Sequence, residues 1–137
     1  MNLYKSEFEF VVSFDELDPM NVVWHGNYIR YMEKARCDMF SKLDYTYADM
    51  EADNYAYPVA KMKVKYIKPA FFNDILIVET KIKEIEPALI IDYLIYNKKT
   101  NDKIFKAQTM QIALDKRTKT TLYVPPKALK DKLENLK

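Results

Sequence analysis

One uninterrupted stretch of helical periodicity, residues 27–43, constrains the fold of this chain more than any other feature. Its apolar residues recur at spacings of three and four, and neither glycine nor proline interrupts them. These apolar positions are Tyr28, Ile29, Tyr31, Met32, Ala35, Met39, Phe40 and Leu43. The stretch would form a helix about 25 Å long, with Gly26 or Asn27 as its N-cap. So broad an apolar face predicts a helix that packs closely against a sheet.

The segments around this helix alternate with the period of two that is typical of strands. In residues 5–14, the side chains of Phe8, Phe10, Val12 and Phe14 fall on one side. Further strands are predicted over residues 59–67, 75–85, 88–96, 103–114 and 120–124, with turns at Glu86-Pro87, 97–102 and 115–119. After Pro125-Pro126, helical spacing predicts a C-terminal helix that contains Leu129, Leu133 and Leu136.

This order of elements predicts an α+β fold, in which a strand and a long helix precede an antiparallel meander of four or five strands. The sheet has to cover the helix, because both carry an apolar face. The chain has 137 residues and no internal repeat or linker, so we expect one domain over residues 1–137.

Composition excludes several classes of function. Lysine and arginine total 22 against 20 acidic residues, and this net charge of +2 gives no general attraction to nucleic acids or anionic membranes. Gly26 is the only glycine, which excludes glycine-rich phosphate loops. The start MNLYKSEFEF lacks the apolar core of a signal peptide, and no apolar run approaches the roughly 18–20 residues of a membrane span. We therefore expect no membrane insertion and a cytoplasmic location.

The chain has one cysteine and one histidine, Cys37 and His25. One of each cannot build the usual zinc sites or an internal disulfide, so we expect neither a metal nor another cofactor. A catalytic pair of Cys37 and His25 is conceivable, but a lone cysteine more often acts as a small buried hydrophobe.

The segment DPMNVVWHGNY, residues 18–28, brings together the only histidine, tryptophan and glycine of the chain. Asp18 lies after a strand and before the helix, whose first N–H groups have no intrahelical partner. Such N–H groups can polarise a substrate carbonyl as an oxyanion hole, and a carboxylate beside them suits acyl transfer. The alternative is that Asp18 only caps the turn at Pro19.

Two aromatic residues of this segment have similar alternatives. His25 can donate a hydrogen bond to Asp18 or to a substrate, or it is a partly buried polar residue at a helix start. Trp24, with Val22 and Val23, can line an apolar pocket or belong to the core. On the predicted strand 59–67, Lys61, Lys63 and Lys65 form a positive stripe that can hold ligand phosphates or simply face solvent.

The segment DPMNVVWHGNY, followed by IRYMEKAR and later by YPVAKMKVKYIKPAFFNDILIVETKI, resembles the signature of the hotdog-fold thioesterases, in the branch of hydroxybenzoyl-CoA thioesterase. The resemblance implies a hotdog fold, with an antiparallel sheet of five or six strands wrapped around the long helix. It further implies homodimers that pair into homotetramers, with acyl-CoA as substrate and the active site at the dimer interface.

The resemblance also implies roles for individual residues. The catalytic aspartate of the family falls on Asp18, and the backbone N–H that polarises the thioester carbonyl falls on His25, whose side chain is also implicated. Trp24, Gly26 and Tyr28 are implied to contact the substrate. Lys61, Lys63 and Lys65 are candidates for contact with the phosphates of coenzyme A.

Two positions depart from the family pattern. Where the family usually has glycine, this chain has Met20-Asn21 in the first block and Asn73 in the second. Asparagine tolerates left-handed backbone angles better than most residues, so we expect Asn21 and Asn73 to replace these glycines. The sequence thus predicts an acyl-CoA thioesterase. The alternatives are a hotdog dehydratase or hydratase, a non-catalytic module that binds acyl thioesters, and a purely structural oligomer.

Overall fold

A computed structural model describes residues 2–136 of the chain. Its main sheet comprises β1 (Tyr4–Val11), β3 (Val59–Tyr66), β4 (Ile75–Glu84), β5 (Leu89–Asn97) and β6 (Lys103–Gln111). Three short strands form a second sheet: β2 (Tyr55–Ala56), β7 (Ala113–Asp115) and β8 (Thr121–Leu122). The helices are η1 (Phe14–Glu16, a 3₁₀ turn), α1 (Asn27–Lys42), α2 (Tyr47–Ala52) and α3 (Lys127–Glu134).

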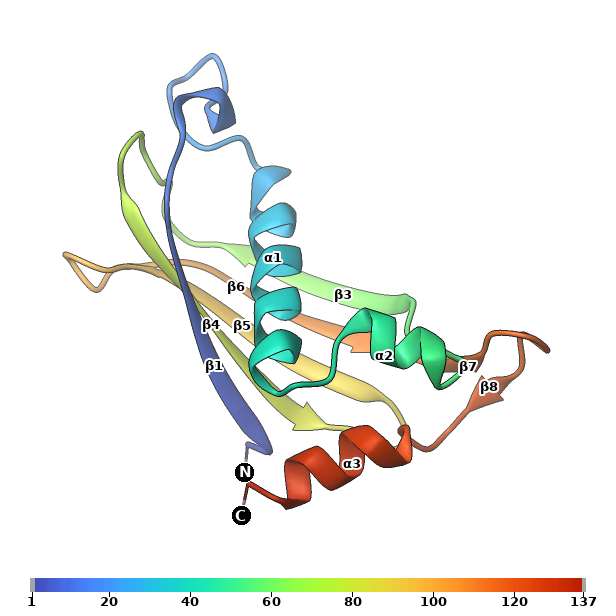
Figure 1. The fold of residues 1–137 in the computed structure, drawn as a ribbon. Helices are drawn as coiled ribbons and strands as arrows, with labels where there is room; N and C mark the ends of the chain where they lie inside the picture. Colours follow the sequence, from blue (N-terminus) through green and yellow to red (C-terminus); the bar gives the residue numbers. More distant parts are fainter. Residues whose placement is uncertain (1, 137) are drawn as a thin grey trace.

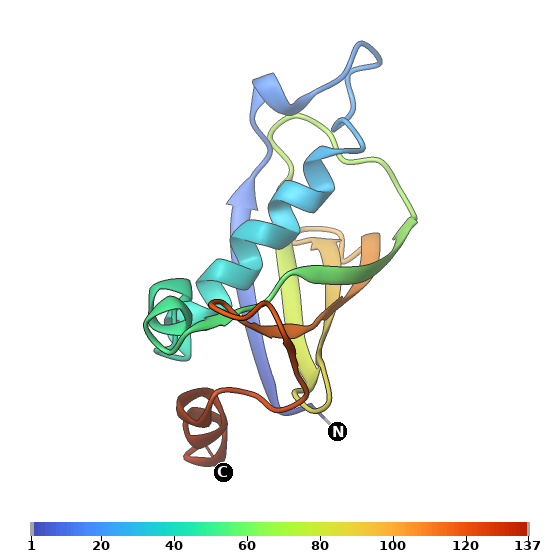
Figure 2. The same cartoon turned by 90° about the vertical axis from the view of Figure 1, so that its right-hand side faces the viewer.

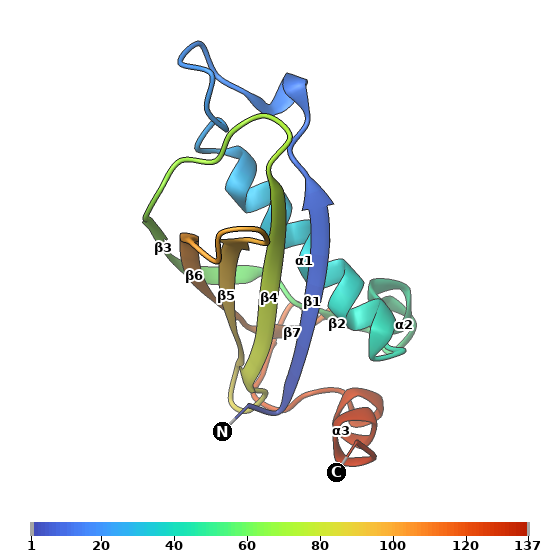
Figure 3. The same ribbon diagram turned by 90° about the vertical axis from the view of Figure 1, so that its left-hand side faces the viewer.

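The main sheet has the strand order β1-β4-β5-β6-β3, and every neighbouring pair is antiparallel. It curves around α1, which crosses its inner face (Figures 1 and 3). The loop between β1 and α1 projects at one end of the molecule, and α2 and α3 lie at the other (Figure 2). This arrangement confirms the predicted antiparallel sheet around one long helix, with five strands. The predicted meander is wrong at its first connection, because β3 pairs with β6 and not with β4, whose free side is taken by β1.

The core forms between α1 and the inner face of the sheet. Alternate residues of β4 and β5 are buried, as the period of two predicts, and they meet the apolar stripe of α1. Among the largest fully buried side chains are Tyr31, Met32, Met39 and Phe40 from the helix and Leu76, Ile82, Leu89 and Ile91 from the sheet. The long helix and its apolar face are therefore as predicted. No helix of the described residues is long and apolar enough to cross a membrane.

The edge strand β3 differs from the other strands of the main sheet, because all eight of its residues are exposed. Its side chains still alternate between the two faces of the sheet, since Tyr66 faces α1 while Lys63 and Lys65 lie on the outer face. However, α1 does not extend over this edge, so the apolar side chains of Met62 and Val64 remain uncovered.

Several expectations about single residues are wrong. Phe14 is 73% exposed, because β1 ends at Val11 and the chain turns at Ser13 into η1, where Glu16 accepts a hydrogen bond from the Ser13 N–H. Cys37 is exposed, since it falls outside the apolar stripe of α1. Leu136 is also exposed, because α3 ends at Glu134.

Arg36 is a buried charge that the sequence pattern did not reveal, since its side chain is only 3% exposed. It donates hydrogen bonds to the hydroxyls of Tyr47 (2.8 Å) and Tyr93 (3.1 Å) and forms an ion pair with Glu33. Thr109 donates to the same Tyr93 hydroxyl at 3.2 Å. Arg36 therefore ties α1 to α2 and to the middle of the sheet.

Replacing Arg36 with alanine should destabilise the protein by about 2–5 kcal/mol, because the change opens a cavity and removes the hydrogen bonds to the hydroxyls of Tyr47 and Tyr93. Urea unfolding followed by circular dichroism measures this change. Arg30→Ala, an exposed position on the same helix, should cost no more than about 0.5 kcal/mol. Equal costs for the two variants would contradict the structural role of Arg36.

Candidate active site

The loop that carries the candidate residues is anchored on both sides. Leu17 and Val23 form an isolated antiparallel bridge, and the Val23 N–H donates to the carbonyl of Ala70 at 2.9 Å. The Trp24 N–H donates to the carbonyl of Glu16 at 3.0 Å. The loop therefore holds a defined position between η1, the start of α1 and the loop that precedes β4.

Asp18 does cap the turn at Pro19. Its Oδ1 accepts a hydrogen bond from the Met20 N–H at 2.8 Å, and its backbone N–H donates to Val22 at 2.8 Å. The side chain is half-buried, and its Oδ2 accepts no hydrogen bond from any residue in the part of the chain that the structure describes. One carboxylate oxygen thus fixes the turn, while the other is open for chemistry.

Both asparagines that replace the usual glycines have left-handed backbones, as predicted. Asn21 has a φ of 65° and Asn73 a φ of 66°. Asparagine carries this conformation at lower cost than most residues because its short side chain can bond locally. The two tight turns are therefore built without glycine.

Gly26, the one glycine, is needed for a different reason. Its φ is −70°, an ordinary helical value, and it is the N-cap residue of α1. A Cβ atom at this position would collide with the indole ring of Trp24, which lies directly over it. Glycine is therefore required here for close approach and not for backbone freedom.

The start of α1 presents unpaired donors. The backbone N–H groups of His25 and Gly26 have no acceptor among residues 2–136, whereas the Asn27 N–H donates to the Trp24 carbonyl at 2.9 Å. The Asn27 side chain also donates to the Glu16 carbonyl at 2.8 Å, which fixes the first turn of the helix. Two free N–H groups at a helix start, where the helix dipole is positive, can bind an oxyanion.

The His25 ring is exposed and lies beside aromatic neighbours. Its centroid is 5.1 Å from that of Trp24 and 6.4 Å from that of Tyr66. Within the described residues its imidazole makes no hydrogen bond to Asp18, and donation to a substrate stays a prediction. Tyr66 donates its hydroxyl to the His25 carbonyl at 3.0 Å and so links the end of β3 to the start of α1.

Tyr28 forms the apolar floor behind this loop. Its ring is buried and stacks on Phe105 at 5.1 Å, with Tyr66 packed edge-on at 5.6 Å. Burial raises the pKa of Tyr28, and the negative charges of Asp74 and Asp18 add to this effect. The Tyr28 hydroxyl is therefore neutral at physiological pH and keeps its proton.

The structure brings Asp18, Trp24, His25, Gly26 and Tyr28 to one end of the molecule, around the start of α1. It does not bring the lysines there: Lys63 lies on the outer face of the sheet, and alternation places Lys61 on that same face. Their contact with substrate stays a prediction. Sequence reasoning missed the role of Tyr66, although its place on the apolar side of the predicted strand was the available signal.

Comparison with known proteins agrees with this arrangement. Residues 12–133 match the thioesterase-like superfamily. A putative acyl-CoA thioesterase of Bacillus subtilis is 34% identical over 80 residues, which cover 58% of this chain and 56% of that protein. The acyl-CoA thioester hydrolase YbgC of Escherichia coli O157:H7 is 32% identical over 69 residues, 50% of this chain and 52% of its own. The chain thus spans about half the length of the curated relatives it matches.

Solved structures extend the likeness to the whole fold. A DHNA-CoA thioesterase from Staphylococcus aureus has a TM-score of 0.82 at 28% identity, covering 96% of this chain and 92% of that one. A 1,4-dihydroxy-2-naphthoyl-CoA thioesterase from Synechocystis has a TM-score of 0.88 at 17% identity, covering 97% and 98%. The fold is therefore the hotdog fold of these thioesterases, as expected. Because the family match extends over most of the sequence, the chain belongs to the thioesterase-like superfamily.

Substituting Gly26 with alanine should displace the Trp24 ring while changing the free energy of unfolding by no more than about 1 kcal/mol, since the backbone angles suit alanine. Trp24 is the only tryptophan, so intrinsic fluorescence reports its environment directly. We expect a shift of the emission maximum relative to the unsubstituted protein. An unchanged spectrum would show that the ring does not depend on the absence of a side chain at Gly26.

Proposed function

We propose that the protein hydrolyses acyl-CoA thioesters to the free acid and coenzyme A. The observation that carries the proposal is the juxtaposition of two unsatisfied groups on one anchored loop. The Oδ2 atom of Asp18 accepts no hydrogen bond among the described residues, and the free N–H groups of His25 and Gly26 lie at the helix start. A carboxylate and an oxyanion hole are what acyl transfer to water requires.

In the proposed reaction, the thioester carbonyl oxygen accepts a hydrogen bond from the N–H of His25. Asp18 either takes a proton from a water molecule that attacks the carbonyl carbon, or attacks that carbon itself to give an anhydride that water then cleaves. In both routes the carbon–sulfur bond breaks and the thiolate leaves with a proton from solvent. The His25 side chain, which is exposed and makes no hydrogen bond to Asp18, would donate a hydrogen bond to the substrate in this proposal.

The substrate class rests on relatives. The Bacillus subtilis and Escherichia coli proteins are named for acyl-CoA thioesters, and the Staphylococcus aureus structure is that of a DHNA-CoA thioesterase. We propose acyl-CoA for this chain as well, with Trp24 and Tyr28 beside the acyl–pantetheine junction. Contact of Lys61 and Lys63 with the phosphates of coenzyme A remains part of the proposal.

We further propose that β3 pairs with the same strand of a second copy. This edge strand exposes its apolar side chains, including Met62, Val64 and Tyr66. An exposed apolar edge is unfavourable in a lone molecule and is removed by pairing. Antiparallel pairing about a two-fold axis would join both sheets into one continuous sheet and form an isologous dimer. The family resemblance extends this proposal to homotetramers in the cytoplasm, and the free thiol of Cys37 suits that reducing compartment.

Such pairing would complete the site. If the axis passes near the middle of β3, Val59 of one copy lies opposite Tyr66 of the other, and Tyr66 bonds to His25. Beside Val59 is a cavity of about 450 Å³, and Tyr57 in its wall has a buried hydroxyl without a hydrogen-bond partner in the described residues. The cavity is lined mostly by aromatic and apolar side chains, including Tyr47, Met50, Tyr55 and Leu114. We propose that this cavity of the partner receives the acyl group.

A non-catalytic module that binds acyl thioesters is the second candidate, favoured by the hydrogen bond that already commits Asp18 Oδ1 to the turn. In that case the carboxylate is structural, and its charge is dispensable. Substitution by asparagine separates the two functions, because the amide oxygen can still accept the bond from the Met20 N–H.

The Asp18→Asn variant should lose at least about 100-fold in the rate of thiol release from acyl-CoA, which is the lower range of a general base. The test uses a panel of aliphatic and aromatic acyl-CoAs with a thiol reagent. Asp131→Asn, which removes the same charge from α3 at the far end of the molecule, should keep full activity. Near-normal turnover by the Asp18 variant would contradict the catalytic role of Asp18. If the unsubstituted protein binds acyl-CoA without hydrolysing it, the non-catalytic binding module is favoured.

Substituting Val64 with glutamate should shift the protein from dimer to monomer in sedimentation velocity, because each copy would then bury a carboxylate at the apolar edge. Hydrolysis should fall with dimer content if the partner completes the site. The matched control is Val11→Glu on β1, the opposite edge of the sheet, where the valine is also exposed, at 51% against 40% for Val64. A Val64 variant that stays dimeric would place the interface elsewhere.

A further inference from the structure

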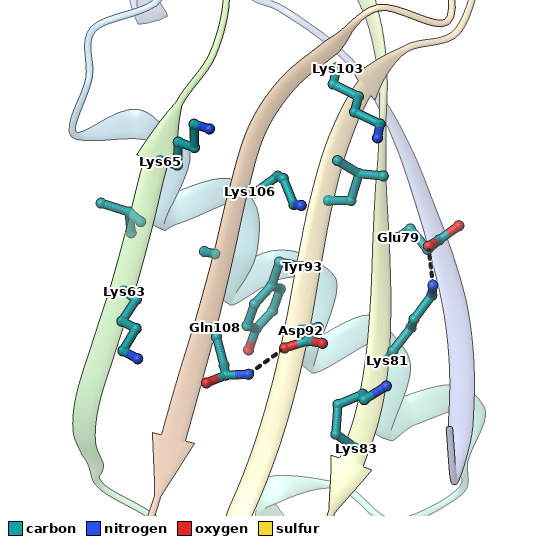
Figure 4. A pocket seen from close by; sticks show the side chains of 13 residues that line it. Lys63, Lys65, Glu79, Lys81, Lys83, Asp92, Tyr93, Lys103, Lys106 and Gln108 are labelled. Atoms are coloured by element: carbon teal, nitrogen blue, oxygen red, sulfur yellow. Dashed lines mark hydrogen bonds and ion pairs between the residues drawn. The ribbon is translucent and has the colours of Figure 1, made fainter. Parts of the chain in front are cut away.

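The outer face of the sheet carries a concentration of positive charge that the overall composition conceals. A groove of about 500 Å³ lies on this face, while α1 passes behind the strands (Figure 4). Its lining includes the side chains of Lys63, Lys65, Lys81, Lys83, Lys103 and Lys106, and we call it the lysine groove. Only two carboxylates, Glu79 and Asp92, line it as well. Its net charge of four exceeds the +2 of the whole chain, so the remaining surface is net negative.

Both carboxylates are already engaged. Glu79 forms ion pairs with Lys81 at 3.0 Å and Lys5 at 3.2 Å, and Asp92 accepts a hydrogen bond from Gln108 at 2.8 Å. Although burial opposes it, these lysines hold the pKa of Glu79 below its usual value. Most of the groove lysines have no carboxylate within ion-pair distance in residues 2–136, namely Lys63, Lys65, Lys83, Lys103 and Lys106.

The register of the strands places like charges together. Lys65 on β3 lies directly opposite Lys106 on β6, and no carboxylate lies between them. Like charges at directly opposite positions destabilise a sheet. The repulsion between these lysines destabilises the fold, and no contact within the described chain offsets it. An acidic ligand would offset it.

The residues of the groove restrict the classes of ligand that it can bind. It contains no arginine for bidentate phosphate binding, and its one aromatic residue, Tyr93, turns its hydroxyl inward to Arg36. The backbone N–H groups of its central strands are committed to the sheet ladder. Single lysines such as Lys63 can still contact a phosphate as point charges, but the groove offers a whole nucleotide neither a stacking surface nor a phosphate nest. Val64 is the one large apolar residue of the lining that is exposed, which is too little apolar surface to insert into a membrane, and a second copy of this face would be repelled.

The spacing of the lysines fits a helix. Lys63 and Lys65 lie on β3, and Lys81 and Lys83 on β4, three strands away. At about 4.8 Å per strand the two rows are about 14 Å apart, slightly more than the 10–12 Å diameter of an α-helix. Leu94 of β5 lies between the rows. We propose that the lysine groove docks an acidic α-helix of a partner protein, with carboxylates on both flanks of that helix.

The test uses a defined probe. An alanine-based helical peptide with glutamates on both flanks is titrated against the full chain at low salt, and a peptide with glutamines at the same positions serves as its control. The glutamate peptide should bind, with an affinity that falls as salt rises, and the glutamine peptide should not. Absence of binding by the glutamate peptide at low salt would overturn the proposal.

Variants locate the binding. The double variant Lys83→Glu/Lys106→Glu should weaken peptide binding about tenfold or more, because two attractive pairs become repulsive. Lys34→Glu/Lys127→Glu makes the same change in net charge on α1 and α3, away from the groove, and should bind like the unsubstituted chain. Equal loss in both variants would mean unspecific attraction and would refute the docking site. Competition by adenosine 3′,5′-bisphosphate or by anionic phosphatidylglycerol vesicles, lost in the groove variant alone, would assign the groove to phosphates instead.

Stability gives a second readout. Lys106→Glu alone should raise the urea midpoint of unfolding while weakening peptide binding, because the new carboxylate faces Lys65. A lower urea midpoint would show that Lys65 and Lys106 do not destabilise the sheet, and the argument from their repulsion would then be lost. Neither measurement involves a thioester, so this inference and the proposed hydrolysis can fail independently.

Discussion

The burial of one face of α1 within the curve of the sheet is the interaction on which the rest of this structure depends. Tyr31, Met32, Met39 and Phe40 are almost fully enclosed, so the helix has one position along the sheet. Its first residue is therefore fixed in space, and with it the free N–H groups of His25 and Gly26. An oxyanion site must be arranged before the reaction begins, because donors that have to reorient give less stabilisation. The core thus fixes the groups of the proposed site, and Tyr28 belongs to both.

The loop around Asp18 shows how a chain with one glycine can still make tight turns. Asn21 and Asn73 accept left-handed backbones, which leaves Gly26 for the position where the Trp24 ring excludes any side chain. Asp18 caps the turn with one oxygen, while the other accepts no hydrogen bond among the described residues. Capping the turn and carrying chemistry are therefore compatible uses of one carboxylate, since the capping bond also orients it.

The fold could be predicted because helix and strands have different periods and each buries one side. The asparagine turns followed instead from the tolerance of asparagine for left-handed angles. Periodicity did not reveal the order of the strands in the sheet, because the meander that it suggested is broken at β3, which pairs with β6. Reasoning from periodicity failed where the burial of a side chain depends on contacts with residues from other parts of the chain. Arg36 is buried because Tyr47, Tyr93 and Glu33 meet it from two helices and a strand, which a helical repeat cannot indicate. Phe14 is exposed because β1 ends early, although its period matches that of Phe8 and Phe10.

The sequence could indicate which residues belong to the candidate site, but not how their side chains are arranged in space. Asp18, Trp24, His25, Gly26 and Tyr28 are close in sequence, so their proximity needs little explanation. Lys61 and Lys63 fall on the outer face because side chains of a strand alternate, while Tyr66, three residues after Lys63, faces the helix and bonds to His25. One edge strand therefore serves two surfaces with opposite chemistry. Its inner side chains border the candidate active site and its outer lysines border the lysine groove, so a change of register by one residue would damage both.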